Sequence, residues 1–202
     1  MFIQVLQGKV RDEHEIRRLL DRWTAELMPG AVGYLGTTAG IADDGMFVAL
    51  ARFESAEAAQ ANSERPEQGQ WWRDMEKCFD GPVTFMDCNE VQSWLSGGSD
   101  DARFVQIMEG QSPEAHRMHE LMKEHEDDIH RVRPEIIGGL MMELDDGRYV
   151  EAIYFTSEDE ARRGEQVELP DDLRTEMERE MQMMGDVTYF DLHEPMLVSA
   201  RR

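Results

Sequence analysis

The chain has few basic residues. Only 21 Lys and Arg side chains stand against 43 Asp and Glu side chains among 202 residues, which gives a formal net charge of −22. A surface of this sign repels phosphate backbones and anionic lipid headgroups over most of its area. The composition therefore argues against nucleic-acid and membrane partners.

Cysteine and long apolar runs are also scarce. Cys78 and Cys88 are too few for a disulfide framework, and we interpret them as reduced thiols that pack as small apolar groups. No run approaches the roughly 20 apolar residues that span a bilayer. The N-terminus has no basic leader, and its apolar run is too short for a signal peptide. We expect a cytoplasmic protein.

One stretch of the sequence occurs twice. FIQVLQG at residues 2–8 returns as FVQIMEG at residues 104–110, an offset of 102 residues. Further landmarks repeat in the same way, the last after a two-residue insertion: Asp43-Asp44-Gly45 with Asp145-Asp146-Gly147, Phe53 with Phe155, and Val83-Thr84-Phe85 with Val187-Thr188-Tyr189. Self-similarity at a fixed spacing indicates an internal duplication.

The boundaries of the repeats follow from these landmarks. Residues 96–101 form a short polar Gly/Ser segment with nothing to bury, as is typical of a linker. We therefore predict repeat 1 at residues 1–95, the linker at 96–101, and repeat 2 at 102–202 with a C-terminal tail.

Each repeat predicts the order strand, helix, strand, strand, helix, strand. The opening strands are short, apolar and rich in β-branched residues. A helix follows, with Asp12 and Glu15 as a capping pattern in repeat 1 and Ser112 before Pro113 in repeat 2. The remaining strands are predicted at residues 32–41, 46–53 and 83–88, and at 136–144, 149–155 and 187–192. Ser55 and Ser157 are predicted caps of the second helical region.

The order βαββαβ is that of the ferredoxin-like unit, an antiparallel four-stranded sheet with both helices on one face. The first and third strands look apolar on both faces, so the second face of each sheet needs a covering partner, and the other repeat supplies one. The predicted fold class is α+β: a tandem duplication whose two four-stranded antiparallel sheets form an α/β barrel within one chain. The result is a pseudo-dimer, which leaves further homodimerisation open.

This arrangement resembles the dimeric α/β-barrel superfamily, and within it the antibiotic biosynthesis monooxygenase-like group in a tandem-fused form. The resemblance lies in the element order, the Phe-(Ile/Val)-Gln start of the first strands, and the segments FESAEAA and FTSEDEA after the third strands. It implies a small-molecule pocket. The resemblance also implies a mechanism, that of the cofactor-independent monooxygenases in this group. In that mechanism a base removes a substrate proton, and the resulting carbanion passes an electron to dioxygen.

If the two sheets face each other, the space between them is the natural pocket. The candidate residues are polar groups on otherwise apolar strands: Gln4 and Gln106 for substrate binding, and Arg52, Glu151, Asp191 and His193 for catalysis. The alternative is that these side chains satisfy backbone groups, pair with surface charges or lie in a loop.

Metal and haem sites are the remaining possibilities. His116 and His119 are spaced to share a helical face, but the histidines of HEDDIH, His125 and His130, are five residues apart instead of the four that a zinc-binding HExxH helix needs. The resemblance implies a haem ligand in the second helical region of some relatives, yet residues 55–79 and 157–184 contain no histidine. We expect no metal and no cofactor.

The sequence therefore predicts a protein that binds a small, largely apolar organic molecule and is a candidate cofactor-independent monooxygenase. A non-catalytic duplicated scaffold or protein-interaction module is the alternative, and haem or metal binding has weaker support. Whether the protein is an enzyme stays open at this level.

Overall fold

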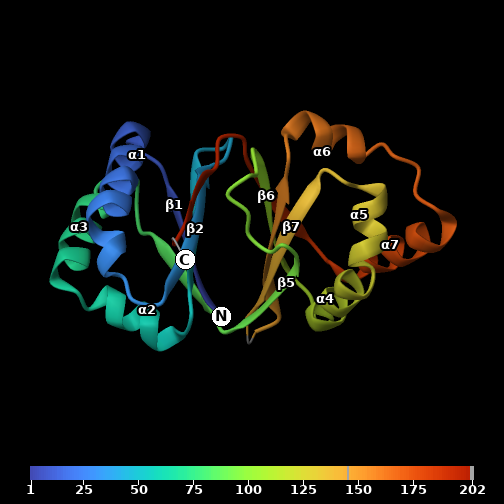
Figure 1. Ribbon diagram of the computed structural model, residues 1–202, viewed down its shortest axis with the longest axis horizontal. Helices are drawn as coiled ribbons and strands as arrows, with labels where there is room; N and C mark the ends of the chain where they lie inside the picture. The colour runs from blue at the N-terminus through green and yellow to red at the C-terminus, as the bar shows by residue number, and fades with distance from the viewer. Residues whose placement is uncertain (145, 201–202) are drawn as a thin grey trace. The chain divides into compact units, whose positions relative to one another are not determined.

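The computed structural model describes residues 1–144 and 146–200, which form two compact units (Figure 1). Unit 1 comprises residues 1–89 and the segment from Met196 onward, and unit 2 comprises Glu90–Pro195. Asp145 of the predicted second turn and residues 201–202 of the predicted tail lie outside the described residues.

Unit 1 has the predicted element order, with one strand added from the C-terminal end of the chain. Its elements are β1 (Phe2–Lys9), α1 (Glu13–Arg22), a π-helical turn (Trp23–Leu27), a 3₁₀ turn (Met28–Gly30), β2 (Tyr34–Ile41), β3 (Met46–Phe53), α2 (Ala56–Ser63), α3 (Pro66–Glu76), β4 (Thr84–Cys88) and β10 (Met196–Ser199). The strands pair antiparallel in the order β10-β2-β3-β1-β4, and Figure 1 shows the helices together on one face of this sheet.

Local sequence signals account for these boundaries. The Asp12 side chain accepts a hydrogen bond from the Glu15 backbone at 3.0 Å and so caps α1, and Ser55 caps α2 through the Ala58 backbone. Gly45 has a φ of 76° in the turn between β2 and β3, a left-handed conformation that suits glycine. These predicted caps and this turn are confirmed.

Unit 2 repeats the pattern. Its elements are β5 (Glu90–Leu95), β6 (Phe104–Gln111), α4 (Ala115–Glu124), α5 (Glu126–Val132), β7 (Ile136–Glu143), β8 (Arg148–Phe155), α6 (Glu158–Gly164), α7 (Asp171–Met183) and β9 (Val187–Leu192). The sheet order is β5-β7-β8-β6-β9, again antiparallel. Ser157 caps α6 as predicted, whereas α4 begins at Ala115 and Ser112 instead caps the preceding turn through the Glu114 backbone.

Each sheet has five strands, so the prediction of four was wrong in number. The fifth strand of each sheet comes from the other repeat: β5, in the sequence of repeat 1, pairs with β7, and β10, at the end of repeat 2, pairs with β2. The compact units therefore do not end where the repeats end. The described strands are hydrogen-bonded into two separate sheets. The predicted tandem fold is therefore present, but the word barrel describes it only loosely.

Both faces of the central strands are buried, as the apolar sequence of β1 and β3 predicted. On the helix-covered face of unit 1, Phe2, Phe47 and Phe53 pack with side chains of α1 and α3. On the opposite face, Ile3 and Leu50 are fully buried. A duplicated ferredoxin-like α+β fold is therefore confirmed.

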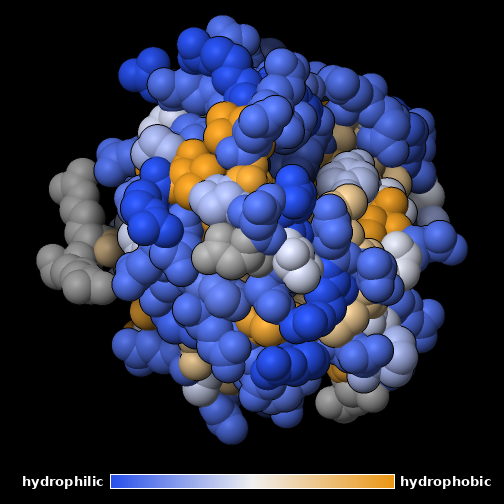
Figure 2. Space-filling view, turned by 90° about the vertical axis from the view of Figure 1, so that its right-hand side faces the viewer, coloured by the Kyte–Doolittle hydropathy of each residue, from blue (hydrophilic) through white to orange (hydrophobic). Residues whose placement is uncertain are grey.

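In the described residues, no helix has both the length and the apolar character needed to cross a bilayer. Figure 2 shows one face of the molecule, on which hydrophilic side chains predominate and hydrophobic ones form small separate patches. This surface agrees with the excess of acidic side chains in the sequence.

Candidate functional site

A cavity of about 350 Å³ lies in unit 1 between the sheet and its helices. The strands contribute the floor, and α1, the π-helical turn, α2 and α3 contribute the roof. The sequence instead predicted a pocket on the other face of the sheet, where the second repeat was expected to pack. This cavity lies on the helix-covered face instead. It is open because the helices do not close completely over the alanine-rich strands beneath them.

The floor owes its depth to small side chains. Ala39, Ala49 and Ala51 of β2 and β3 all line the cavity. Ala49 pairs with Ala39 on one side and with Leu6 on the other, so these side chains share one face of the sheet. A row of methyl groups leaves open a space that larger side chains would fill.

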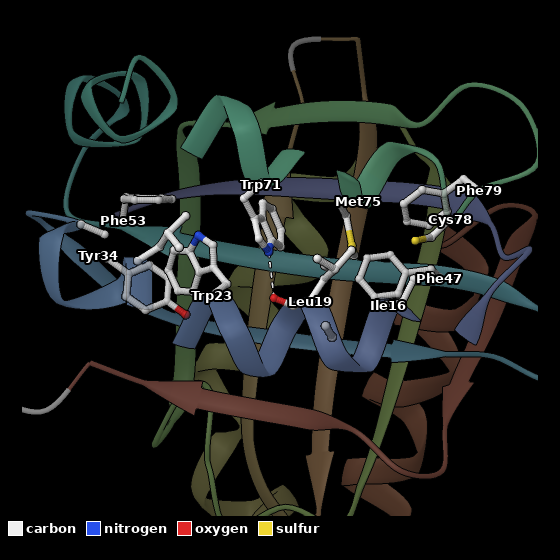
Figure 3. Close-up of a cluster of buried hydrophobic side chains, with 14 of the residues drawn as sticks. Ile16, Leu19, Trp23, Tyr34, Phe47, Phe53, Trp71, Met75, Cys78 and Phe79 are labelled. Atoms are coloured by element: carbon white, nitrogen blue, oxygen red, sulfur yellow. Dashed lines mark hydrogen bonds between the residues drawn. The ribbon is translucent and has the colours of Figure 1, made fainter. Parts of the chain in front are cut away.

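The roof carries aromatic side chains. Trp23 contacts Tyr34 in a T-shaped arrangement with ring centroids 4.8 Å apart, and its centroid lies 6.4 Å from that of Trp71. Trp72 contacts Phe85 of β4 at 5.1 Å, and Phe85 is 46% exposed, which places this pair toward the solvent side of the cavity. Figure 3 shows Trp23, Tyr34 and Trp71 gathered between α1 and the sheet. The walls therefore offer ring faces to a flat ligand.

A π-helical turn positions part of this roof. It follows α1 directly, and its first two residues, Trp23 and Thr24, both line the cavity. The Thr24 hydroxyl donates to the Leu20 carbonyl at 3.0 Å, which holds the widened turn in place. Turns of this kind are rare and are frequent at functional sites.

The polar atoms of the aromatic side chains are bonded within the protein. The Trp23 indole N–H donates to Gln68 Oε1 at 2.7 Å, and that of Trp71 donates to the Leu19 carbonyl at 2.8 Å (Figure 3). The Tyr34 hydroxyl donates to Thr37 Oγ1 at 2.7 Å. These rings are therefore fixed in orientation.

Two carboxamides supply the hydrogen-bond donors of the roof. Asn62, which is 7% exposed, accepts a hydrogen bond from Arg65 through Oδ1, and Gln68 accepts one from Trp23 through Oε1. Guanidinium and indole groups can only donate, so the oxygen of each amide must face its partner. The nitrogens Asn62 Nδ2 and Gln68 Nε2 have no acceptor among the described residues. Each side chain therefore retains a free NH₂ group.

The cavity is electrically neutral. Among the described residues that line it there is no Asp, Glu, His, Lys, Arg or Cys. A neutral, mostly apolar lining favours a neutral ligand and gives no obvious side-chain base.

Gln4 is the one predicted site residue that lines this cavity. Its Nε2 donates to Asp87 Oδ1 at 2.8 Å, and in unit 2 Gln106 donates to Asp191 Oδ1 at the same distance. The duplication has therefore kept a Gln–Asp pair that links β1 with β4 and β6 with β9.

Arg52 and Glu151 lie in different environments. Arg52, next to the cavity-lining Ala51, points to the opposite face of the sheet, where it is 6% exposed and donates to Thr38 Oγ1 at 2.9 Å. Glu151 is 2% exposed and pairs with Met108 and Met141 in unit 2. Neither residue lines the cavity of unit 1.

Asp191 and His193 are held by other groups of unit 2. Asp191 accepts hydrogen bonds from Gln106 and Arg162. The His193 Nδ1 atom lies 2.7 Å from Glu158 Oε2, and this pair is more than a third exposed. Their predicted catalytic roles stay predictions.

The two histidines on α4 approach the same carboxylate. His119 is 1% exposed, and its Nδ1 lies 2.7 Å from Glu143 Oε1, which His116 approaches at 3.3 Å. Within residues 1–144 and 146–200, no group of three or more His, Cys, Asp or Glu side chains is placed to hold a metal ion.

No family model matches the chain, and no curated protein matches it either. Several solved structures match it in fold. A "putative monooxygenase" from Fusobacterium nucleatum has a TM-score of 0.78 at 10% identity over 98% of this chain and 94% of its own. A second "putative monooxygenase", from Lactobacillus acidophilus, has a TM-score of 0.74 at 10% identity over 98% and 99%. An "anthrone oxidase-like protein" has a TM-score of 0.70 at 10% identity over 100% and 94%.

These similarities define the class of fold. The chain has the tandem ferredoxin-like fold of proteins named as monooxygenases, so the resemblance expected from the sequence is confirmed at the level of the fold. Because identities of 10% show fold alone, any activity must be argued from the site.

Proposed function

We propose that unit 1 binds a neutral, flat aromatic ketone or phenol in its cavity, and that the chain is a monooxygenase-like oxidoreductase that uses dioxygen without a cofactor. The observation that carries the proposal is the neutral cavity with aromatic walls and two fixed amide donors, Asn62 and Gln68. Its volume of about 350 Å³ suits a small ligand, because ligand pockets span roughly 300–1,000 Å³.

The lining supports a particular kind of substrate. A substrate bound here has no carboxylate or imidazole beside it to remove a proton, so its own C–H group must be acidic. Amide N–H donors beside a ketone oxygen stabilise the enolate that forms when the proton leaves, which lowers the pKa of the substrate. Asn62 and Gln68 are the donors we assign to this role.

Anthrone is a suitable probe, and the structural similarity to an anthrone oxidase-like protein supports the choice. Its acidic C–H bond breaks, the proton passes to water, and the electron pair is shared with the ketone oxygen. The enolate gives one electron to dioxygen, the two radicals join in a C–O bond, the peroxide takes a proton back from water, and loss of water from this hydroperoxide leaves anthraquinone. One anthrone and one dioxygen thus yield one anthraquinone and one water.

The decisive variant is Asn62→Leu. Leucine matches the shape of asparagine but has no N–H to donate, and it brings neither a charge nor a base into the cavity. We expect oxygen consumption with anthrone to fall about tenfold, the equivalent of one hydrogen bond of about 1.4 kcal/mol. Circular dichroism checks that the fold persists without the acceptor for Arg65, and Asn89→Leu, at an exposed position, should match the wild type.

Two results would contradict this proposal. One is wild-type oxygen consumption no faster than that of anthrone in buffer. The other is loss of activity in His193→Ala, because the proposal gives no chemical role to that partly exposed histidine. The roles predicted for Arg52, Glu151 and Asp191 would be reconsidered together with that of His193.

A binding protein without catalytic activity is the second candidate, and the absence of an ionisable acid–base pair from the cavity lining favours it. Anthraquinone cannot be oxidised further in this way, so quenching of tryptophan fluorescence by anthraquinone measures binding alone. Binding of anthraquinone without oxidation of anthrone would support this candidate over the enzyme.

A further inference from the structure

The floors of the two units can be compared position by position, because both sheets pair in the same register. In unit 1, the Ala49 row runs across the sheet as Met196, Ala39, Ala49, Leu6 and Phe85. Its counterpart in unit 2, the Glu151 row, runs as Gln92, Met141, Glu151, Met108 and Tyr189. The two rows occupy equivalent places beneath the helices.

A second pair of rows lies two residues further along the strands. In unit 1, the Ala51 row runs as Val198, Thr37, Ala51, Gln4 and Asp87. Its counterpart in unit 2, the Ile153 row, runs as Trp94, Gly139, Ile153, Gln106 and Asp191. The Gln–Asp pair is the same in both rows, so the alignment of the remaining positions is secure.

Side-chain size differs consistently between the two floors. The three alanines of unit 1 are replaced by Met141, Glu151 and Ile153, and Val198 is replaced by Trp94. Met141 is 0% exposed and Glu151 is 2% exposed, so these larger groups lie inside unit 2. The space that is open above the floor of unit 1 is therefore occupied in unit 2.

Trp94 occupies much of this space. Its side chain is 0% exposed and belongs to the core cluster that includes Phe104, Met141 and Leu173. Gly139, the unit 2 counterpart of Thr37, makes room for it: a Cβ atom on Gly139 would lie 1.8 Å from the Trp94 Nε1 atom. A glycine is required where the indole ring crosses the strand.

The Trp94 indole N–H contributes nothing to this arrangement, because its buried Nε1 has no acceptor among the described residues. By contrast, the Trp23 and Trp71 indoles of unit 1 each donate a hydrogen bond. A buried tryptophan usually finds a partner for its N–H group. The position of Trp94 is therefore explained by its volume alone.

We infer that unit 2 contains a second binding site of the same origin as the cavity of unit 1, closed by Trp94 together with Met141, Glu151 and Ile153, and that replacing these four side chains by their unit 1 counterparts opens it to neutral apolar aromatic molecules. The floor residues decide which unit is open. This inference rests on the proposed function only in taking the cavity of unit 1 as a ligand site.

The test counts binding sites with N-phenyl-1-naphthylamine, a neutral aromatic probe whose fluorescence rises in apolar surroundings. We expect one site per chain in the wild type and two in Trp94→Val/Met141→Ala/Glu151→Ala/Ile153→Ala, which places the unit 1 residues at the four enlarged positions of unit 2. The reciprocal double variant Thr37→Gly/Val198→Trp should bind none, because it adds the indole to unit 1 and removes no large core group.

Each outcome decides between the possibilities. A folded four-position variant with one site would overturn the inference. If that variant does not fold, Trp94→Val/Glu151→Ala takes its place, and the same count of sites decides. The Thr37→Gly/Val198→Trp variant tests the matching positions in unit 1, and probe binding by it would show that they do not control access. Probe stoichiometry does not depend on anthrone oxidation, so failure of the proposed enzyme reaction leaves this test intact.

Discussion

His119 shows how burial changes the chemistry of a single residue. Burial lowers the pKa of its imidazole, while the hydrogen bond to Glu143 and the charge of that carboxylate oppose the shift only in part. The ring also lies edge-on to Tyr149, with centroids 6.4 Å apart. The folded state therefore keeps this histidine neutral at pH values where an exposed histidine is charged.

This shift predicts how stability depends on pH. Below about pH 6.5 the unfolded chain binds a proton at His119 that the folded chain does not, so the free energy of unfolding falls as the pH falls. Urea unfolding at pH 7.5 and pH 5.5 should show a smaller loss of stability in His119→Gln than in the wild type. His14→Gln, at an exposed side chain of unit 1, should behave as the wild type. Equal losses in His119→Gln and the wild type would contradict the assignment.

Residue identity alone could not reveal the site. Asn62 and Gln68 read as ordinary polar residues of a helical region, and their donor role follows from Arg65 and from Trp23, which is 45 residues away from Gln68. One signal was present in the sequence: Ala49 and Ala51 alternate on a strand, which leaves space on one face. Of the predicted residues, Gln4 lines the cavity, but from the helix-covered face of the sheet and not from the space between the sheets in which the prediction placed it.

Among the elements, those with strong local signals were predicted well. The strand β9 occupies Val187–Leu192, as predicted, and the hairpin strands β2 and β3 begin and end within two residues of their predicted limits. β5 and β10 were missed. They are short edge strands whose partners lie in the other repeat, so their pairing depends on tertiary structure that local periodicity does not carry.

The strand β10 has a specific role in the site, because Met196 and Val198 line the cavity of unit 1. Deletion of residues 196–202 should therefore open one wall, and we expect the affinity for N-phenyl-1-naphthylamine to fall at least tenfold. Leu197→Ala is the matched control, since its side chain points to the other face of the strand. Unchanged affinity in the truncated chain would show that β10 is dispensable for the cavity.

At the scale of the whole molecule, the exchange of β5 and β10 connects the two units. The sheet of unit 1 takes β10 from residues that follow unit 2 in the sequence, so it is complete only once the chain has passed through unit 2, whereas all five strands of the unit 2 sheet lie within Glu90–Pro195. Two domains joined by a linker alone would lack this dependence.

We therefore expect the units to unfold together. Trp23, Trp71 and Trp72 report on unit 1, and Trp94 reports on unit 2. Two variants separate these signals: Trp94→Phe, which reports on unit 1, and a variant that keeps only Trp94, which reports on unit 2. In each variant, the urea midpoint measured by tryptophan fluorescence should match the midpoint measured by circular dichroism. Two separate circular-dichroism transitions in either variant would indicate that the strand exchange does not couple the units.

The unequal floors of the two units also bear on how such a chain can change over generations. In an association of two identical chains, every substitution appears in both binding sites at once, so a residue that improves packing in one also fills the other. Once the copies are joined, Ala49 and Glu151 are separate positions under separate selection. The fused chain can then retain an open site in one half while the other half gains a tightly packed interior.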